Sequence, residues 1–168
     1  MDFLPLAAER YSSRKFEDRP VPQEAVDKIL AAASLAPTAH NNQPQEIIVV
    51  QSPEALALLR KCTECHFGAP LAFIISYDRD RAWKRSYDGK DSGDVDASIV
   101  TTHMMLEAAD LGLGSCWVMD FIPEAVRAEF ELPDNLEPVA ILPAGYPAGG
   151  PSPIHGKKRP VEGYVTYR

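Results

Sequence analysis

The segment DVDASIVTTHMMLEAADLG, residues 94–112, constrains the fold more than any other part of the sequence. Its apolar residues cover most of the circumference of a helix, and Gly112 is of the type that commonly ends one. A helix that is apolar nearly all round must be buried. We therefore expect other elements to cover it on nearly all sides, and we interpret His103 as a packed, hydrogen-bonded side chain rather than a base.

Shorter helices and strands alternate around this segment, with no repeat and no low-complexity linker. Residues 21–36 carry an apolar stripe at helical spacing after Pro22, and residues 52–61 begin with Ser52, a good helix cap. The sequence predicts a single domain over residues 1–168. Its expected elements are helices over 21–36, 52–61, 94–112 and 123–130, and strands over 47–50, 71–77, 115–119 and 138–146.

The C-terminal tail, PSPIHGKKRPVEGYVTYR at 151–168, differs from the rest of the chain. It is rich in proline, then basic, then β-prone, and it is too polar to belong to the core of its own chain. We expect an arm, starting at about residue 150, that reaches a partner molecule.

Composition excludes several classes of function. The chain has 168 residues, 45% of them apolar, and a formal net charge of -7, so it has no overall basic surface for nucleic acid or anionic membranes. No segment has the length of a membrane span, and the first residues do not form a secretory signal. Three cysteines, an odd number, fit a reducing compartment. We expect a cytoplasmic protein.

The stretch CTECH, residues 62–66, has the spacing used for covalent haem attachment. Such attachment accompanies export, for which this chain has no signal, so we interpret the stretch as a helix end. Cys62 and Cys65 have no second cysteine pair to complete a zinc site, and we expect no metal. The dinucleotide-binding glycine pattern, the Walker loop and the nucleophile elbow are also missing from the sequence.

The stretch RYSSRKFEDRP, residues 10–20, places four cations and two hydroxyls within eleven residues. Arg10, Ser12 and Arg14 occupy alternate positions, so an extended backbone would direct them towards one anion. A solvated turn is the alternative, because Glu17 and Asp18 follow. A second basic step lies at 157–159.

A cluster of amides occurs in APTAHNNQPQ, where Asn41, Asn42 and Gln43 follow a predicted helix and precede a strand. Asn and Gln provide donors and acceptors without charge, which suits a planar ring edge with alternating carbonyl and N–H groups, such as the pyrimidine edge of a flavin. A polar loop is the alternative interpretation. Together with the basic residues, the cluster favours a cofactor that has both a phosphate and a polar ring.

In these motifs the sequence resembles the FMN-dependent nitroreductases, and the resemblance extends over nearly the whole chain. RYSSRKF, APTAHNNQPQ, MMLEAADLGLGSCWV, VAILPAGYPA and KKRP occur in the order typical of that family. The resemblance implies an α+β fold with a central β-sheet flanked by helices, in a homodimer that exchanges C-terminal arms and shares two flavin sites. It also implies ping-pong transfer of hydride from NAD(P)H through flavin N5 to an acceptor such as a nitroaromatic or a quinone, which removes the need for a dinucleotide-binding domain.

The resemblance assigns roles to particular residues. The FMN phosphate would be held by the basic motif and the tail, and the ring by the amide-containing loop of the other chain, with a backbone N–H of Met119 or Asp120 beside flavin N5. The cofactor-binding residues implied are Arg10, Tyr11, Ser12, Arg14, Pro37, Thr38, Ala39, Asn41, Gln43, Met119, Asp120, Lys157 and Arg159.

The sequence departs from the family pattern at several positions. Gln45 stands where many members have an aromatic residue, and Met119 and Asp120 stand where a Glu-Gly or Gly-Gly step is usual. A carboxylate at Asp120 would either lower the flavin potential or point to solvent. Two alternatives stay open: a flavoprotein of this fold with another reaction, such as reductive dehalogenation or flavin fragmentation, and a flavin-binding protein without turnover.

Overall fold

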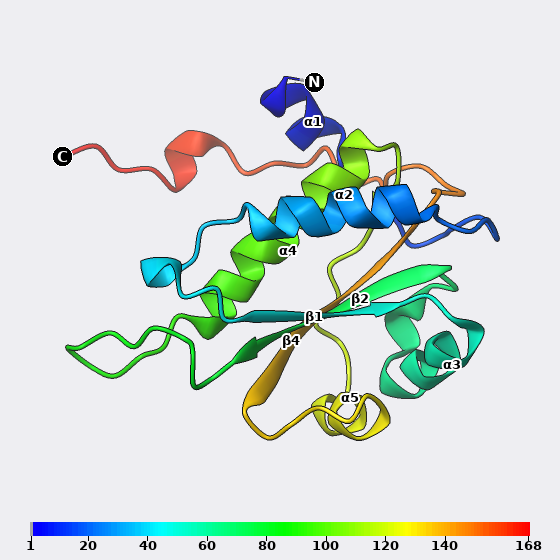
Figure 1. Cartoon of the computed structure of the whole chain (residues 1–168). Coiled ribbons are helices and arrows are strands. Elements are labelled where there is room, and N and C mark those ends of the chain that lie inside the picture. The colour runs from blue at the N-terminus through cyan, green and yellow to red at the C-terminus, as the bar shows by residue number, and fades with distance from the viewer. Residues whose placement is uncertain (1) are drawn as a thin grey trace.

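The computed structural model describes residues 2–168. Four strands form one antiparallel sheet in the order β1-β2-β4-β3, and helices cover both of its faces (Figure 1). The strands are β1 (Gln45–Val50), β2 (Leu71–Asp78), β3 (Gly114–Ser115) and β4 (Leu136–Gly145). The helices are α1 (Phe3–Glu9), α2 (Gln23–Ser34), α3 (Pro53–Cys62), α4 (Gly93–Asp110) and α5 (Pro123–Glu129), with short 3₁₀ turns at Ala39–Asn41, Glu64–His66 and Val161–Gly163. The predicted α+β architecture is therefore confirmed.

Strand β2 divides the core into two clusters, because successive side chains of a strand point to opposite faces. Leu71, Phe73 and Ile75 pack with α2 and α4 on one face. Ala72 and Ile74 pack with α3 and α5 on the other. A strand that is covered on both faces needs a nearly continuous run of apolar residues, and residues 71–77 form such a run in the sequence.

The ends of the helices follow from local sequence signals. Ser52 Oγ accepts a hydrogen bond from Ala55 N at 3.1 Å and caps α3, which has Pro53 in its first turn. Helix α3 ends at Cys62, so CTECH is the end of a helix, as predicted. In α4, His103 is half-buried and its Nδ1 lies 3.0 Å from Ile99 O. Both observations agree with the prediction of a packed, hydrogen-bonded histidine.

The predicted strand over residues 115–119 is only partly correct. Regular pairing stops after Ser115, although Val118 still exchanges two backbone hydrogen bonds with Ile141 on β4. Cys116 N donates to Pro143 O at 3.1 Å, but Pro143 has no N–H to complete the pair. Residues 114–120, here called the β3 strip, therefore leave β4 as an irregular segment.

Helix α4 is not covered on all sides within one chain. Its buried residues face the sheet and α2, but Val95 is 54% exposed and Thr102 is also exposed. Ser98, Ile99 and Leu106, which lie near them at helical spacing, are only half-buried. The expectation of nearly complete cover is thus wrong for the single chain, because one apolar stripe of α4 has no partner among residues 2–168.

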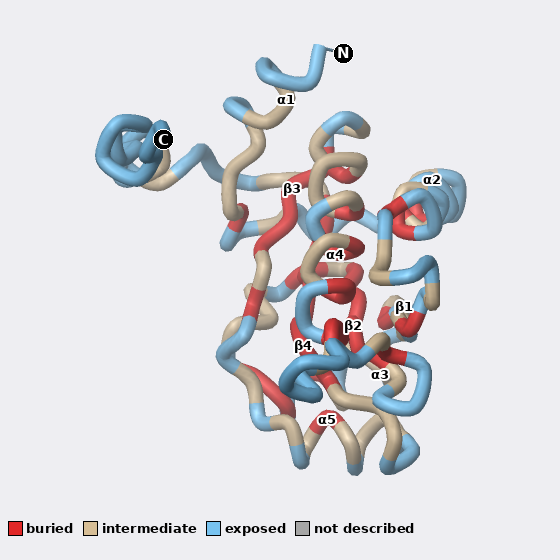
Figure 2. Tube along the Cα trace, turned by 90° about the vertical axis from the view of Figure 1, so that its left-hand side faces the viewer, coloured by how far each residue is buried: buried red, intermediate tan, exposed pale blue. Residues whose placement is uncertain are grey.

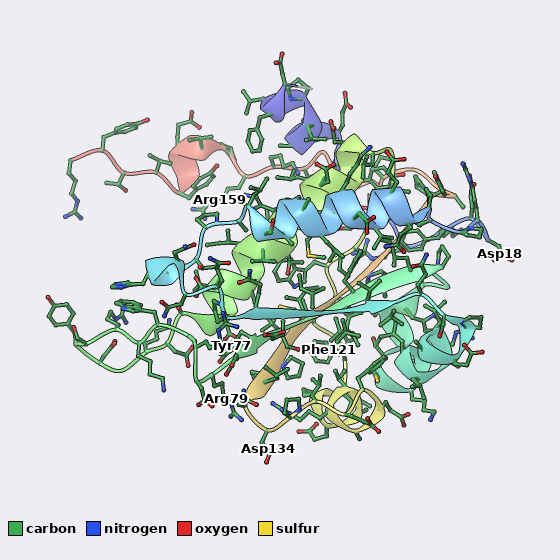
Figure 3. All side chains as sticks on the ribbon, in the orientation of Figure 1. Asp18, Tyr77, Arg79, Phe121, Asp134 and Arg159 are labelled. Carbon is green, nitrogen blue, oxygen red and sulfur yellow. The ribbon has the colours of Figure 1, made fainter. Side chains whose placement is uncertain are left out.

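Gly93 allows α4 to start against β2. A Cβ atom at this position would lie 2.0 Å from Cε2 of Tyr77, whose ring fills that space beside the first turn of α4 (Figure 3). Burial, with the nearby carboxylates of Asp91 and Asp94, raises the pKa of Tyr77 to about 12. The phenol therefore stays neutral at physiological pH, and its ring packs as an apolar group.

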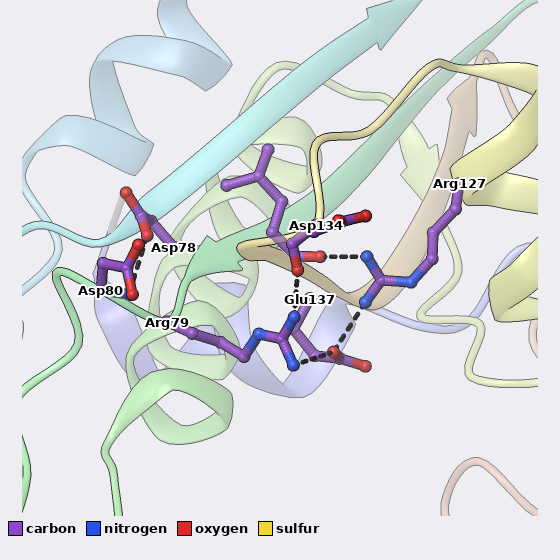
Figure 4. A network of polar contacts seen from close by, with 7 residues as sticks. Asp78, Arg79, Asp80, Arg127, Asp134 and Glu137 are labelled. Carbon is purple, nitrogen blue, oxygen red and sulfur yellow. Dashed lines mark hydrogen bonds and ion pairs between the residues drawn. The ribbon is translucent and has the colours of Figure 1, made fainter.

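The far end of the sheet is tied together by charged side chains (Figure 4). Arg127 donates to Leu136 O at 2.6 Å and to Glu137 at 2.7 Å, while Arg79 donates to Asp134 O. These contacts join α5 to the start of β4 and to the end of β2.

Candidate functional site

The basic motif forms an extended segment along β3. Ser12 pairs with Ser115 in a parallel bridge, and Ser13 N donates to Ser115 O at 2.9 Å. In this extended backbone Arg10, Ser12 and Arg14 reach the same pocket, whose volume is about 210 Å³. We call it the basic pocket, and it is lined by Arg10, Tyr11, Ser12, Arg14, Ser152, Ile154, His155, Lys157 and Lys158.

The C-terminal tail supplies the second wall of the basic pocket. Tyr11 Oη donates to Gly149 O at 2.5 Å, and His155 Nε2 lies 3.1 Å from Ala8 O. The rings of Tyr11 and His155 meet edge to face, with centroids 6.1 Å apart. These contacts bring Lys157 and Lys158 close to the arginines, so the two basic steps of the sequence meet within one chain.

The cations of the basic pocket lack anionic partners. No ion pair involves Arg10, Arg14, Lys157 or Lys158 within residues 2–168. Arg10 Nη1 is buried, and no other atom of residues 2–168 forms a hydrogen bond with it. Leaving a buried charged donor unpaired costs roughly 1–3 kcal/mol or more, and a bound anion would remove that cost. The pocket therefore fits a phosphate group.

Arg159 lies outside the basic pocket in this chain. Its guanidinium donates to Gly163 O and is 5.7 Å from the ring centroid of Tyr164, so it folds onto its own turn of the tail (Figure 3). Residues 156–168 are all exposed, and the tail stands away from the body of the molecule (Figure 2). Lys158, which belongs to the basic residues 157–159 but was not among the assigned cofactor-binding residues, lines the pocket in its place.

The β3 strip leads from the basic pocket to Met119 and Asp120. Burial raises the pKa of the Cys116 thiol, although Arg14 and a hydrogen bond with Ser12 oppose the shift. The carbonyl of Asp120 accepts a 2.5 Å hydrogen bond from Thr63 Oγ1, which anchors the backbone there. Met119 is 71% exposed, and the N–H groups of Met119 and Asp120 make no hydrogen bond within residues 2–168. They are available to a ligand.

CTECH lies beside Asp120. Cys65 Sγ is 4.0 Å from Asp120 Oδ2, and Cys62 is fully buried against Leu59. Burial raises the pKa of the Cys62 thiol. A buried, neutral thiol is not suited to covalent attachment of haem. No group of three metal-ligating side chains occurs among the residues that the structure describes.

The amide-containing loop, residues 38–43, has an unusual backbone; we call it the amide loop. His40, Asn41 and Gln43 have φ angles of 53°, 54° and 49°, in the left-handed region that non-glycine residues rarely adopt. Gln43 Nε2 donates to Asn41 Oδ1 at 3.2 Å, and Gln43 N donates to Thr38 Oγ1 at 3.0 Å. Asn41, Gln43 and the preceding Pro37 are exposed. The side chains assigned to ring recognition are thus open to a ligand.

The amide loop and the basic pocket lie at opposite ends of α4. Ala39 contacts Asp96 near the start of the helix, whereas Arg10 and Tyr11 line a second pocket with Ala109 and Gly112 at its end. At 1.5 Å per residue, these ends are about 20 Å apart. The structure does not bring the two groups of predicted residues together within one chain.

Comparison with known proteins decides the family. The model of the nitroreductase family matches residues 7–67 and 59–146. A Methanothermobacter thermautotrophicus protein, provisionally named NADH dehydrogenase/NAD(P)H nitroreductase, is 35% identical over 90% of this chain and 80% of its own length. This chain belongs to the nitroreductase family.

Solved nitroreductase-family structures have the same fold. One from Clostridium difficile 630 is 45% identical, with a TM-score of 0.95 over 99% of this chain and 98% of that one. The FMN complex of a Desulfovibrio desulfuricans protein is 27% identical, with a TM-score of 0.82 over 98% of this chain and 95% of that one. The resemblance deduced from the sequence motifs is confirmed.

Several site residues of this nitroreductase-family chain gave no signal in the sequence. Ser115 has a buried hydroxyl without a partner and lines the second pocket with Arg10. His155 joins the basic pocket through contacts with residues nearly 150 positions away. The alternation in residues 10–14, by contrast, gave a local signal, because those side chains are neighbours in the chain itself.

No helix in residues 2–168 combines the length and the apolar character that crossing a membrane requires.

Proposed function

We propose that this nitroreductase-family protein is an FMN-dependent oxidoreductase. It takes hydride from NADH or NADPH and passes the electrons to an acceptor such as a nitroaromatic or a quinone, with donor and acceptor using the site in turn. The observation that carries the proposal is the unpaired, buried Arg10 Nη1 in a pocket lined by further cations. FMN, when bound, supplies the redox chemistry, and the protein residues supply its binding and orientation.

The phosphate of FMN fits the basic pocket. A phosphate carries nearly two negative charges and three acceptor oxygens, and the alternate side chains Arg10, Ser12 and Arg14 offer charge-assisted donors to it. Lys157 adds a cation from the tail. The β3 strip then leads towards Met119 and Asp120, whose available N–H groups would face the redox-active part of the ring.

A shared site in a homodimer explains why the predicted residues lie apart in one chain. The amide loop and the basic pocket are about 20 Å apart along α4. If the uncovered stripe of α4 around Val95, Ile99 and Thr102 pairs with its copy in antiparallel fashion, the amide loop of one chain approaches the basic pocket of the other. The exposed tail would then carry Arg159 onto the partner as an exchanged arm.

The unpaired state of Cys62, Cys65 and Cys116 supports a reducing, cytoplasmic location for this proposed enzyme.

Anaerobic mixing of the purified, FMN-loaded protein with NADH or NADPH tests the function. Bleaching of the flavin absorbance, followed by its return when a quinone or nitroaromatic is added, would support an oxidoreductase. The matched control is Arg19→Ala, which removes a cation that lines neither pocket containing Arg10 and should bleach like wild type. A stable yellow colour with both nucleotides would contradict the proposal and would indicate a flavin-binding protein without turnover.

A further inference from the structure

The amide loop needs an external support, because its backbone is unfavourable. Three non-glycine residues in the left-handed region cost of order 1 kcal/mol or more each, and such backbones persist only where surrounding contacts hold them. The loop has one short 3₁₀ turn, Ala39–Asn41, and its residues belong to neither the sheet nor a long helix. Gln43 makes hydrogen bonds within the loop, to Thr38 and Asn41, and the remaining contacts come from elsewhere in the chain.

These contacts come from the segment between β2 and α4. Asn42 Nδ2 donates to Arg81 O at 2.9 Å. The ring of His40 stacks on Trp83, with centroids 5.3 Å apart and planes 16° from parallel. Both contacts lie near the surface, where water and mobile side chains compete with them.

The third contact involves a buried carboxylate. Asp96, 2% exposed, accepts a hydrogen bond from Ala39 N through Oδ1 at 2.9 Å, and one from Ser92 Oγ through Oδ2 at 2.6 Å. No cation pairs with Asp96 within residues 2–168. A carboxylate is costly to bury, so its two hydrogen bonds must compensate. One of them fixes the first residue of the strained turn.

We propose that Asp96 is a positioning residue for cofactor binding. Its carboxylate holds the N–H of Ala39 and thereby sets the backbone of residues 38–43, so that Asn41 and Gln43 present their amides in one orientation. This inference rests on the proposed function, in which the amide loop contacts FMN. Asp96 acts through Ala39 and does not itself touch the cofactor.

Two substitutions at Asp96 separate positioning from charge. Asp96→Ala removes the acceptor, so hydrogen exchange of the Ala39 amide in cofactor-free protein should accelerate at least tenfold, and the Kd for FMN should rise about tenfold. Asp96→Asn keeps an oxygen for Ala39 N–H and offers its NH₂ group to Ser92 Oγ. It should therefore restore both exchange and Kd to within about twofold of wild type.

Ser92→Ala is the matched control. It removes the other hydrogen bond of the same buried carboxylate, so it should lower the melting temperature, while exchange at Ala39 and the Kd for FMN stay near wild type. If Ser92→Ala and Asp96→Ala have equal effects on both readouts, Asp96 has only a general structural role and the proposal is wrong. An unchanged Kd in folded Asp96→Ala would also overturn it.

Ala39→Pro tests the same hydrogen bond from the other side, should Asp96→Ala fail to fold. Thr38 has extended φ and ψ angles of -129° and 157°, which the residue before a proline can adopt. The Pro variant should weaken FMN binding about tenfold, because it removes the N–H that Asp96 holds. Unchanged binding in the Pro variant would contradict the proposal. If wild-type protein binds no FMN, the proposed function fails, and exchange in the Asp96 variants still decides whether Asp96 holds the loop.

Discussion

The basic pocket and the amide loop differ in what determines their shape. The basic pocket is made by side chains on an extended segment, which pairs with β3 in the manner of an extra strand. The amide loop is shaped by its own backbone, in a conformation that its residues do not favour. Both regions are held by residues distant in the chain, but the first depends on the charge of its side chains, whereas the second depends on the conformation of its own backbone. Their sensitivities to mutation should therefore differ.

The largest effect on FMN binding should come from combining substitutions in the two regions. Arg14→Ala and Asn41→Ala homodimers should each bind FMN poorly, because every shared site carries one lesion. When the two variants are unfolded and refolded together, a heterodimer has one site with both lesions and one site with none. We expect an FMN titration to show a tight-binding fraction equal to the undamaged sites.

The control for this mixture is mass spectrometry that counts the heterodimers. If heterodimers form and no tight-binding fraction appears, the two regions do not share a site between chains.

Gly93→Ala should cause the largest loss of stability and should act at the amide-loop end of α4. The new Cβ would lie 2.0 Å from the Tyr77 ring, and moving that buried ring costs about 3 kcal/mol. Urea denaturation measures the loss. Gly156→Ala is the matched control, because nothing lies within 4 Å of a Cβ there. A Gly93→Ala midpoint equal to that of the control would show that Tyr77 moves aside without cost.

Arg10→Ala should act on the basic pocket alone. Loss of a charge-assisted phosphate contact of about 2 kcal/mol corresponds to a roughly thirtyfold weaker Kd for FMN, measured by quenching of flavin fluorescence. Arg19→Ala is the comparison, since the Arg19 guanidinium stacks 3.7 Å from the ring centroid of Tyr146 and lines neither pocket that contains Arg10. Equal losses in both variants would mean that net charge, not the pocket, determines affinity.

The smallest effect concerns the tail. Arg159→Ala should weaken FMN binding by about tenfold if the arm carries Arg159 into a partner's pocket. In the isolated chain Arg159 contacts only its own turn of the tail. An unchanged FMN titration would therefore exclude Arg159 from the site, and Lys157 and Lys158 would be the cations that the tail supplies.

The sequence predicts those features that arise between near neighbours in the chain. The buried strand β2, the Ser52 cap and the convergence of Arg10, Ser12 and Arg14 all follow from periodicity or spacing. The early end of regular pairing in the β3 strip depends on Pro143, which lies opposite it on β4. Such a pairing depends on register, which a single strand does not reveal.

The sequence also predicts that residues 38–43 are polar and suited to a ring edge, but not how they are held. Asp96 reads as an ordinary acidic residue in the first turns of a helix, and its burial against Ala39 is a property of the tertiary structure. Likewise, the choice of Lys158 over Arg159 in the basic pocket depends on the direction of each side chain from an irregular tail. Composition identifies the charge of that segment but not its geometry.

The basic pocket is built from two segments that lie far apart in the chain, residues 10–14 and 152–158. The contacts that join them, Tyr11 to Gly149 and His155 to Ala8, span 138 and 147 positions, and the tail beyond them is exposed. Proteolysis near residue 150 should therefore open the pocket while the sheet and its two core clusters stay intact.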